Sequence, residues 1–219
     1  MKEIKYYKFW GSTSLKETGI IQQVQDLTIK ATQEIMHGYQ NKVYDTFTDN
    51  IPDFKVLKLH RQAKITDVLN AGQFLSRSDG FIVNAKVKNV LEGYKSENFK
   101  FYDAMITDWQ GKTYPYYVFG VNLSPEIIDY KQSEFMITNY LRNKNIEPIA
   151  INSFKELQKK EESIANIKLN KVILKRDWDV LKLPLHNALL ISERLRQAFI
   201  AEKITGTTFN ESGVSFFID

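Results

Sequence analysis

Two carboxylates in the segment RDWD, residues 176–179, have a spacing that could support chemistry. If this segment is extended, Asp177 and Asp179 lie on the same side, because successive side chains of a strand alternate. Two carboxylates could bind a hard cation or divide acid and base roles between them. The alternative, which the sequence favours, is a polar strand edge around a partly buried Trp178.

Other ligands and nucleophiles are scarce. The chain has no cysteine, which excludes disulfides, thiolate zinc sites and a cysteine nucleophile. His37, His60 and His186 are isolated, and none has a second histidine three or four residues away to share a metal. We therefore predict no catalytic, metal-binding or cofactor-binding site, and an enzyme would have to assemble one from separated residues such as Asp177, Asp179 and His186.

Phosphate-binding and nucleophile motifs are also missing from the sequence. There is no glycine-rich phosphate loop and no Gly-x-Ser-x-Gly elbow. The tripeptide GKT at residues 111–113 ends like a Walker motif, but Ile106 stands where the first glycine is required, and the segment leads into a strand.

Nucleic-acid binding has somewhat more support. The segments YYKFW and YPYYVF place aromatic residues near basic ones, and Lys86, Lys88, Arg194 and Arg196 add charge beside helix starts. Aromatic residues also alternate in ordinary strands, and lysine and arginine populate ordinary helix surfaces. Structural packing is the favoured interpretation, so we do not expect a nucleic-acid partner.

The elements that must position these residues include a unit that occurs twice, at residues 80–93 and 188–202. In the first, an apolar run is followed by Asn84 as the N-cap of an amphipathic helix. In the second, Ser192 takes the place of Asn84. Each unit is predicted to be a strand, a cap and a helix, which either a duplication or two unrelated units under the same rules would produce.

The remaining pattern predicts a mixed, mainly antiparallel α+β fold. Two aromatic strands around Gly111 predict a hairpin in which Pro115 lies at an edge or near the strand start. Further predictions are helices over residues 20–35, 65–75 and 151–164, the last capped by Asn152 or Ser153, and a closing hairpin over residues 205–218. We divide the chain into an N-terminal portion, residues 1–60, packed on a main domain, residues 61–219.

Composition is that of a globular protein, with 43% hydrophobic and 26% charged residues among 219. Charges interrupt the N-terminal apolar residues, and no apolar run approaches eighteen residues, so we expect a cytoplasmic protein without a membrane partner. The formal net charge of +4 is spread along the chain.

From about Lys64 to Phe209 the order of motifs resembles a bacterial family of immunity proteins in polymorphic toxin systems, formerly a domain of unknown function. The matching motifs are KITDVLNAG, SDGFIVNAKVKNVLE, YPYYVFGVN with IDYKQSEF, and ILKRDWDVLKL followed by LLISERLRQAFIAEKITGTTF. The resemblance implies a protein that binds a cognate secreted toxin and blocks it without performing a reaction. It implies no catalytic residues.

The charge adds an independent expectation about such a toxin. Opposite potentials steer two proteins together, so inhibitors of basic nucleases are expected to be acidic. At +4 this chain instead favours a toxin with a neutral or acidic contact face. A nucleic-acid-binding regulator and an enzyme with a dispersed site are the alternatives.

Overall fold

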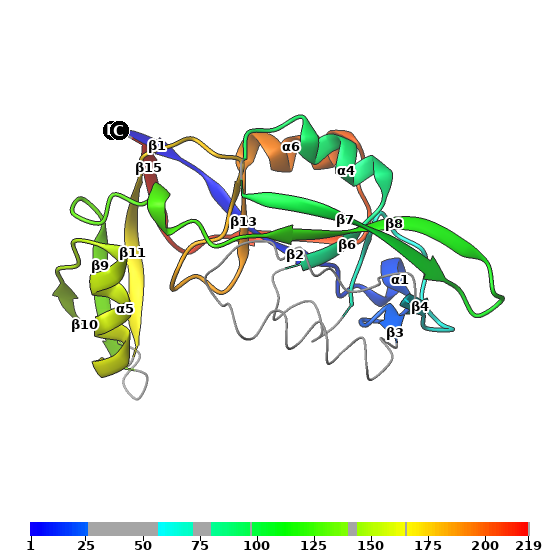
Figure 1. Ribbon diagram of the computed structural model, residues 1–219, viewed down its shortest axis with the longest axis horizontal. Coiled ribbons are helices and arrows are strands. Elements are labelled where there is room, and N and C mark those ends of the chain that lie inside the picture. Colours follow the sequence, from blue (N-terminus) through cyan, green and yellow to red (C-terminus); the bar gives the residue numbers. More distant parts are fainter. Residues whose placement is uncertain (26–56, 72–79, 97, 140–143, 165, 219) are drawn as a thin grey trace.

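The computed structural model describes residues 1–25, 57–71, 80–96, 98–139, 144–164 and 166–218. Within these ranges the chain forms three sheets, mostly antiparallel, with short helices packed on them (Figure 1). This arrangement confirms the predicted mixed α+β class.

A five-stranded sheet lies at one end of the molecule (Figure 1). Its order is β1 (Lys2–Ile4), β15 (Ser215–Ile218), β11 (Ile167–Leu174), β9 (Glu134–Asn139) and β10 (Lys144–Ile149). Only β11 and β15 run parallel. Helix α5 (Phe154–Ser163) is capped by Ser153, one of the two predicted caps, and buries Leu157 in the core of this sheet. A short 3-10 helix, η2 (Pro125–Ile127), joins the same core.

A six-stranded sheet forms the other end. Its order is β3 (Val24–Gln25), β4 (Leu57–Leu59), β7 (Phe99–Thr107), β8 (Thr113–Val121), β6 (Gly80–Val83) and β5 (Val68–Leu69). Strands β7 and β8 form the predicted hairpin, and Gly111 in its loop has the expected positive φ, +84°. Pro115 lies where β8 has a neighbour on one side only, because the pairing of β6 begins at Tyr117.

A four-stranded sheet lies between these two (Figure 1). Its order is β12 (Val180–Leu181), β13 (Leu189–Ser192), β2 (Tyr6–Gly11) and β14 (Thr207–Glu211). Strand β2 is thus an inner strand between two strands from the C-terminal half of the chain. Helix α1 (Leu15–Thr18) follows β2. Segments from both sides of residue 60 therefore share sheets and core.

Both predicted strand, cap and helix units are present. Asn84 follows β6 and accepts a hydrogen bond from Val87 N (3.1 Å) at the start of α4 (Ala85–Glu92). Ser192 ends β13 and accepts one from Leu195 N (3.2 Å) at the start of α6 (Glu193–Ala201). The two helices pack side by side on the same side of the strands (Figure 1).

The repetition extends from these units to whole four-stranded modules. The first repeat has the strand order β5-β6-β8-β7, and the second has β12-β13-β2-β14, with antiparallel neighbours throughout. Their registers agree as well. Val83 pairs with Tyr117 in the first repeat, and Ile191 pairs with Tyr7 at the corresponding position of the second.

Strand β8 of the first repeat and strand β2 of the second hold the same place in their sheets and are called the middle strands below. A tyrosine on each middle strand makes an equivalent buried hydrogen bond. Tyr116 donates its hydroxyl to the carbonyl of Thr66 (2.7 Å), and Tyr6 donates to the carbonyl of Trp178 (2.6 Å). Each acceptor lies two residues before the first strand of its repeat. Burial raises the pKa of both phenols, so both remain neutral donors.

The aspartate before β5 joins the two repeats. The Asp67 carboxylate accepts a hydrogen bond from the Asn84 amide (2.7 Å), the cap of its own helix. It also accepts from the backbone N–H (2.8 Å) and hydroxyl (2.9 Å) of Thr205, which lies in the chain after α6 of the second repeat. Asp67 therefore fixes the start of one helix relative to the exit of the other.

The aspartate before β12, Asp179, joins the repeats in the opposite direction, from the second repeat to the first. The Asp179 carboxylate accepts from the hydroxyl of Ser192, the cap of α6, and from the backbone N–H of Lys95 (2.9 Å), which follows α4. The carbonyl of Lys95 in turn accepts from Asp179 N (2.7 Å). The exchange between the repeats is thus reciprocal, and the pair Asp67 and Asp179 is called the aspartate clamp below.

Two helix predictions are wrong where the structure describes them. Residues 65–75 do not begin a helix, because Val68 and Leu69 form β5 and pair with Val83 and Ile82. Residues 20–25 contain β3 instead of a helix start. In both segments, pairing with a distant strand overrides the local pattern. The remaining parts, residues 26–35 and 72–75, lie outside the described ranges.

The predicted closing hairpin over residues 205–218 is also wrong. Strand β14 pairs with β2 in the four-stranded sheet, whereas β15 pairs with β1 and β11 in the five-stranded sheet. The chain changes sheets around Ser212 and Gly213, where φ of the glycine is +75°. Adjacent strands with a turn between them satisfy the hairpin pattern, so only their partners reveal the crossover.

The aspartate clamp yields a stability prediction. Asp179→Ala should lower the free energy of unfolding by about 2–4 kcal/mol, because it leaves buried donors without an acceptor. Asp67→Ala, at a more exposed position, should cost about 1–2 kcal/mol. Urea unfolding followed by tryptophan fluorescence measures both.

Asp103→Ala is the matched control, because Asp103 is exposed on β7 and is not part of the aspartate clamp. It should change stability by less than about 0.5 kcal/mol. An Asp179→Ala protein as stable as this control would contradict the proposed role of the clamp.

Candidate interaction surface

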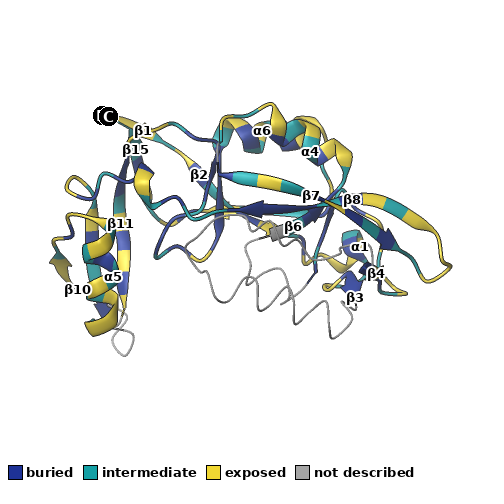
Figure 2. Cartoon of the chain, viewed as in Figure 1, coloured by how far each residue is buried: buried dark blue, intermediate teal, exposed yellow. Residues whose placement is uncertain are grey.

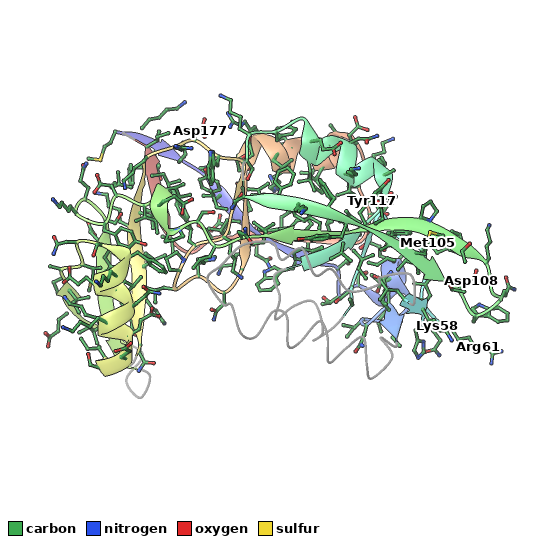
Figure 3. All side chains as sticks on the ribbon, viewed as in Figure 1. Lys58, Arg61, Met105, Asp108, Tyr117 and Asp177 are labelled. Atoms are coloured by element: carbon green, nitrogen blue, oxygen red, sulfur yellow. The ribbon has the colours of Figure 1, made fainter. Side chains whose placement is uncertain are left out.

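The carboxylates that the sequence singled out are held by one guanidinium. Arg194 donates from Nη1 to Asp177 Oδ2 (3.1 Å), from Nη2 to Asp179 Oδ2 (2.9 Å) and from Nε to Asp179 Oδ1. The interaction with Asp179 leads the causes that raise the pKa of Arg194, so this side chain stays charged. Asp179 is 1% exposed, whereas Asp177 lies at the surface (Figure 3).

These contacts define what Asp179 does. Each of its carboxylate oxygens accepts two hydrogen bonds, from Ser192 and Arg194 on one and from Lys95 and Arg194 on the other. A bound cation or substrate would have to displace these donors. Asp177, Asp179 and Arg194 therefore form a structural network around the cap of α6. The segment is not the polar strand edge that the sequence favoured, because β12 begins only at Val180, and Trp178 is 8% exposed.

His186 is not brought to these aspartates by any described contact. Its ring nitrogens face the carbonyls of Ala188 (3.2 Å) and Ser212 (3.4 Å), and the side chain is buried. His60 accepts a hydrogen bond from Gln62 N (3.2 Å) at a turn, and His37 lies outside the described ranges. In the described part of the chain, no three histidine, aspartate or glutamate side chains gather as metal ligands would.

The basic residues that could neutralise phosphates are largely occupied by internal contacts. Lys88 Nζ lies 4.4 Å from the centre of the Tyr117 ring, and Arg196 Cζ lies 4.6 Å from that of Tyr7. These are the same contact in the two repeats, a cation on the helix above an aromatic ring on the middle strand. Lys86 is exposed on α4.

The aromatic segments YYKFW and YPYYVF are the middle strands of the two repeats. Phe9 and Phe119 occupy corresponding positions and are 2% and 1% exposed. Tyr6 and Tyr116 are also buried. These four rings are packed in cores, so they are not surfaces for stacking bases, whereas Trp10 of the first segment is 37% exposed.

An open surface with exposed side chains lies at the far end of the β7–β8 hairpin (Figures 2 and 3). Side chains at alternate positions of β7 and β8 point to the face that α4 covers nearer the centre. Beyond Tyr117 these are Asp103, Met105, Thr107, Thr113 and Pro115, and Lys58 of β4 joins them beside Thr107. With the loop residues 108–112 and Arg61, they are called the hairpin end below.

The opposite face of the same strands is buried. Tyr102, Ala104 and Ile106 of β7 and Tyr116 of β8 belong to one apolar core with Leu57 of β4. The strands therefore present one apolar face to the core and one mixed face to the outside, as an antiparallel sheet commonly does.

The loop of the hairpin end is held together by its own hydrogen bonds. The Asp108 carboxylate accepts from the backbone N–H groups of Gln110 and Lys112 (both 2.9 Å) and from the hydroxyl of Tyr114 (2.9 Å). Desolvation opposes ionisation of Asp108, but these hydrogen bonds outweigh it and lower its pKa. Gly111 supplies the positive φ of the turn. The turn is thus supported by hydrogen bonds within the loop itself.

An exposed tryptophan stands on this loop. The Trp109 side chain is 60% exposed, and the guanidinium of Arg61 lies 5.5 Å from its ring centre. Lys112 Nζ similarly lies 5.0 Å from the Tyr114 ring. Tryptophan and arginine are two of the residue types most enriched among the strongest contacts of protein interfaces.

The sequence did not single out this surface. The loop DWQGK was visible as a hairpin turn, and a tryptophan in a turn, where it has no core to enter, is a usable signal of a binding residue. Arg61 and Lys58 gave no such signal, because they reach the hairpin through the pairing of β4 with β7, more than forty positions away in the chain.

Comparisons with known proteins add no family or relative: no protein-family model matches the chain, and no curated protein matches it. The resemblance to immunity proteins therefore stays a prediction from the sequence motifs. Among the described residues, no helix has the length and apolar character needed to cross a membrane.

The buried histidine yields a pH prediction. Burial lowers the pKa of His186 below its ordinary value near 6.5, helped by the charges of Lys8 and Lys182 and opposed by the two carbonyl contacts. The folded state then binds fewer protons than the unfolded state. Stability from this group should be complete above about pH 6.5 and lost as pH falls through the lowered pKa.

Urea unfolding of the wild type and of His186→Gln between pH 7 and pH 5 tests this. The wild type should lose stability over that range, and the variant should lose less. His60→Gln, in the turn after β4, is the matched control and should keep the wild-type dependence. Equal pH dependence of the wild type and His186→Gln would refute the assignment.

Proposed function

We propose that this chain is an immunity protein that acts in the cytoplasm by binding a cognate secreted toxin and occluding it, without performing a reaction. The sequence resemblance over about residues 64–209 supplies the class of function. The observation that carries the proposal in the structure is the hairpin end, an outward surface on a hydrogen-bonded loop, where Trp109 is 60% exposed and lies beside Arg61.

The organisation of the charged side chains supports a binding role. Asp179, one of the carboxylates considered for chemistry, has both of its oxygens occupied by hydrogen bonds from Ser192, Lys95 and Arg194. The hairpin end, by contrast, keeps its side chains at the surface on a fixed backbone. Preorganised surfaces of this kind lose little conformational entropy on association, which favours tight and specific binding.

Neutralisation by occlusion predicts protection in proportion to complex formed. Co-expression of the chain with the toxin encoded beside its gene should restore growth, and the purified proteins should co-elute as a complex of fixed stoichiometry. Titration should abolish toxin activity only when the chain reaches that ratio.

An unrelated protein of similar size and charge, expressed from the same promoter, is the control and should not protect. Continued killing despite good expression of the chain would overturn the proposal. Neutralisation far below the stoichiometric ratio would overturn occlusion and indicate catalysis instead.

A further inference from the structure

We infer that the hairpin end is the surface that contacts the toxin and that the toxin face it fits is acidic. This inference rests on the proposed function and adds to it the place of contact and the chemistry of the partner.

The hairpin end is a part of the first repeat that the second repeat lacks. Phe101 and Phe209 hold corresponding positions, because they pair with Phe119 and Phe9. Strand β14 ends at Glu211, which corresponds to Asp103, whereas β7 continues to Thr107 and into the loop. The second repeat therefore caps its helix and builds its sheet without this extension.

Helix cover also stops where the extension begins. Lys88 of α4 lies above Tyr117, and the described residues place no helix over the strands beyond that point (Figure 1). Figure 3 shows Met105, Asp108, Lys58 and Arg61 gathered at this end, away from Asp177. The extension thus leaves a sheet face and a loop open to a partner.

Trp109 is the expected anchor of this contact. Its ring is large, 60% exposed and held by Arg61 at 5.5 Å, and the loop beneath it is fixed by Asp108. A fixed aromatic side chain can enter a pocket of the partner without a large loss of rotamer freedom.

The charge of the hairpin end points to an acidic partner. Lys58, Arg61 and Lys112 are exposed, and the negative charge of Asp108 is turned inward to the loop's own N–H groups. Asp103 is the remaining exposed carboxylate on the open face. Complementary potentials speed encounter and align interfaces, so an acidic protein face fits this arrangement.

A protein fits better than a nucleic acid. Exposed Asp103 stands on the open face and would repel phosphates. The cations also lie over the rings of Trp109 and Tyr114, which leaves those rings partly covered for base stacking. A protein surface can place acidic side chains beside the cations, a basic side chain beside Asp103, and a pocket around Trp109.

The test measures binding of the full chain to the toxin encoded beside its gene, by calorimetry and by association kinetics at two salt concentrations. Trp109→Ala should weaken binding by at least about tenfold, as truncation of an interface anchor does. Lys58→Glu with Arg61→Glu should slow association and reverse its salt dependence.

Matched controls are Trp10→Ala, at a tryptophan 37% exposed on β2, and Lys131→Glu, at an exposed lysine in the turn before β9. Both should bind within about twofold of the wild type, since neither lies at the hairpin end. Melting temperatures of all variants show whether each is folded.

The outcomes separate the inference from the function on which it rests. If the wild type binds the toxin and both hairpin-end variants bind equally well, the inference is wrong and the proposed function stands. If the folded wild type does not bind, the proposed function fails. If the chain instead binds DNA or RNA at low salt and loses this binding in Trp109→Ala, the acidic protein partner is refuted.

Discussion

Each of two aspartates binds the cap of its own helix and the chain that leaves the other helix. This reciprocal contact ties α4 and α6 to each other and to the strands before them, because Asp67 reaches Thr205 and Asp179 reaches Lys95. Two short helices would have marginal stability alone. The position of α4 and α6 depends on these hydrogen bonds and on the aromatic strands beneath them. The arrangement of the two repeats at the centre of the molecule therefore depends on the clamp.

The central part of the protein is consequently a pair of equivalent modules built from separated segments. The first repeat is nearly continuous, whereas the second takes its middle strand from the N-terminus as β2. Equivalent hydrogen bonds of Tyr116 and Tyr6, in the same register, exceed what two unrelated capped helices would require. These agreements favour duplication over convergence. The five-stranded sheet has no part in the repeat, but its core around α5 is continuous with the second repeat through Tyr6, Leu181 and Leu190.

Function is best sought where the repeats differ. Residues shared by both repeats, such as the two clamp aspartates and the helix caps Asn84 and Ser192, are used to hold the fold. Asp179, which the sequence offered as a candidate for chemistry, is held further by Arg194. The hairpin end is not needed for that purpose, and it places Trp109 outside the core. A fixed projection on a stable framework is a common way for proteins to present binding residues. The proposed toxin contact follows from this division of roles.

The sequence by itself determined the α+β class, the caps Asn84 and Ser192, α5, and the β7–β8 hairpin, because capping and alternation act over a few residues. Tertiary structure alone decided which strands pair. It made β5 from a segment with a helical pattern, sent β14 and β15 to different sheets, and brought Arg61 to Trp109. These outcomes depend on contacts between segments far apart in the chain, and local residue patterns carry no information about which distant partner will bury them.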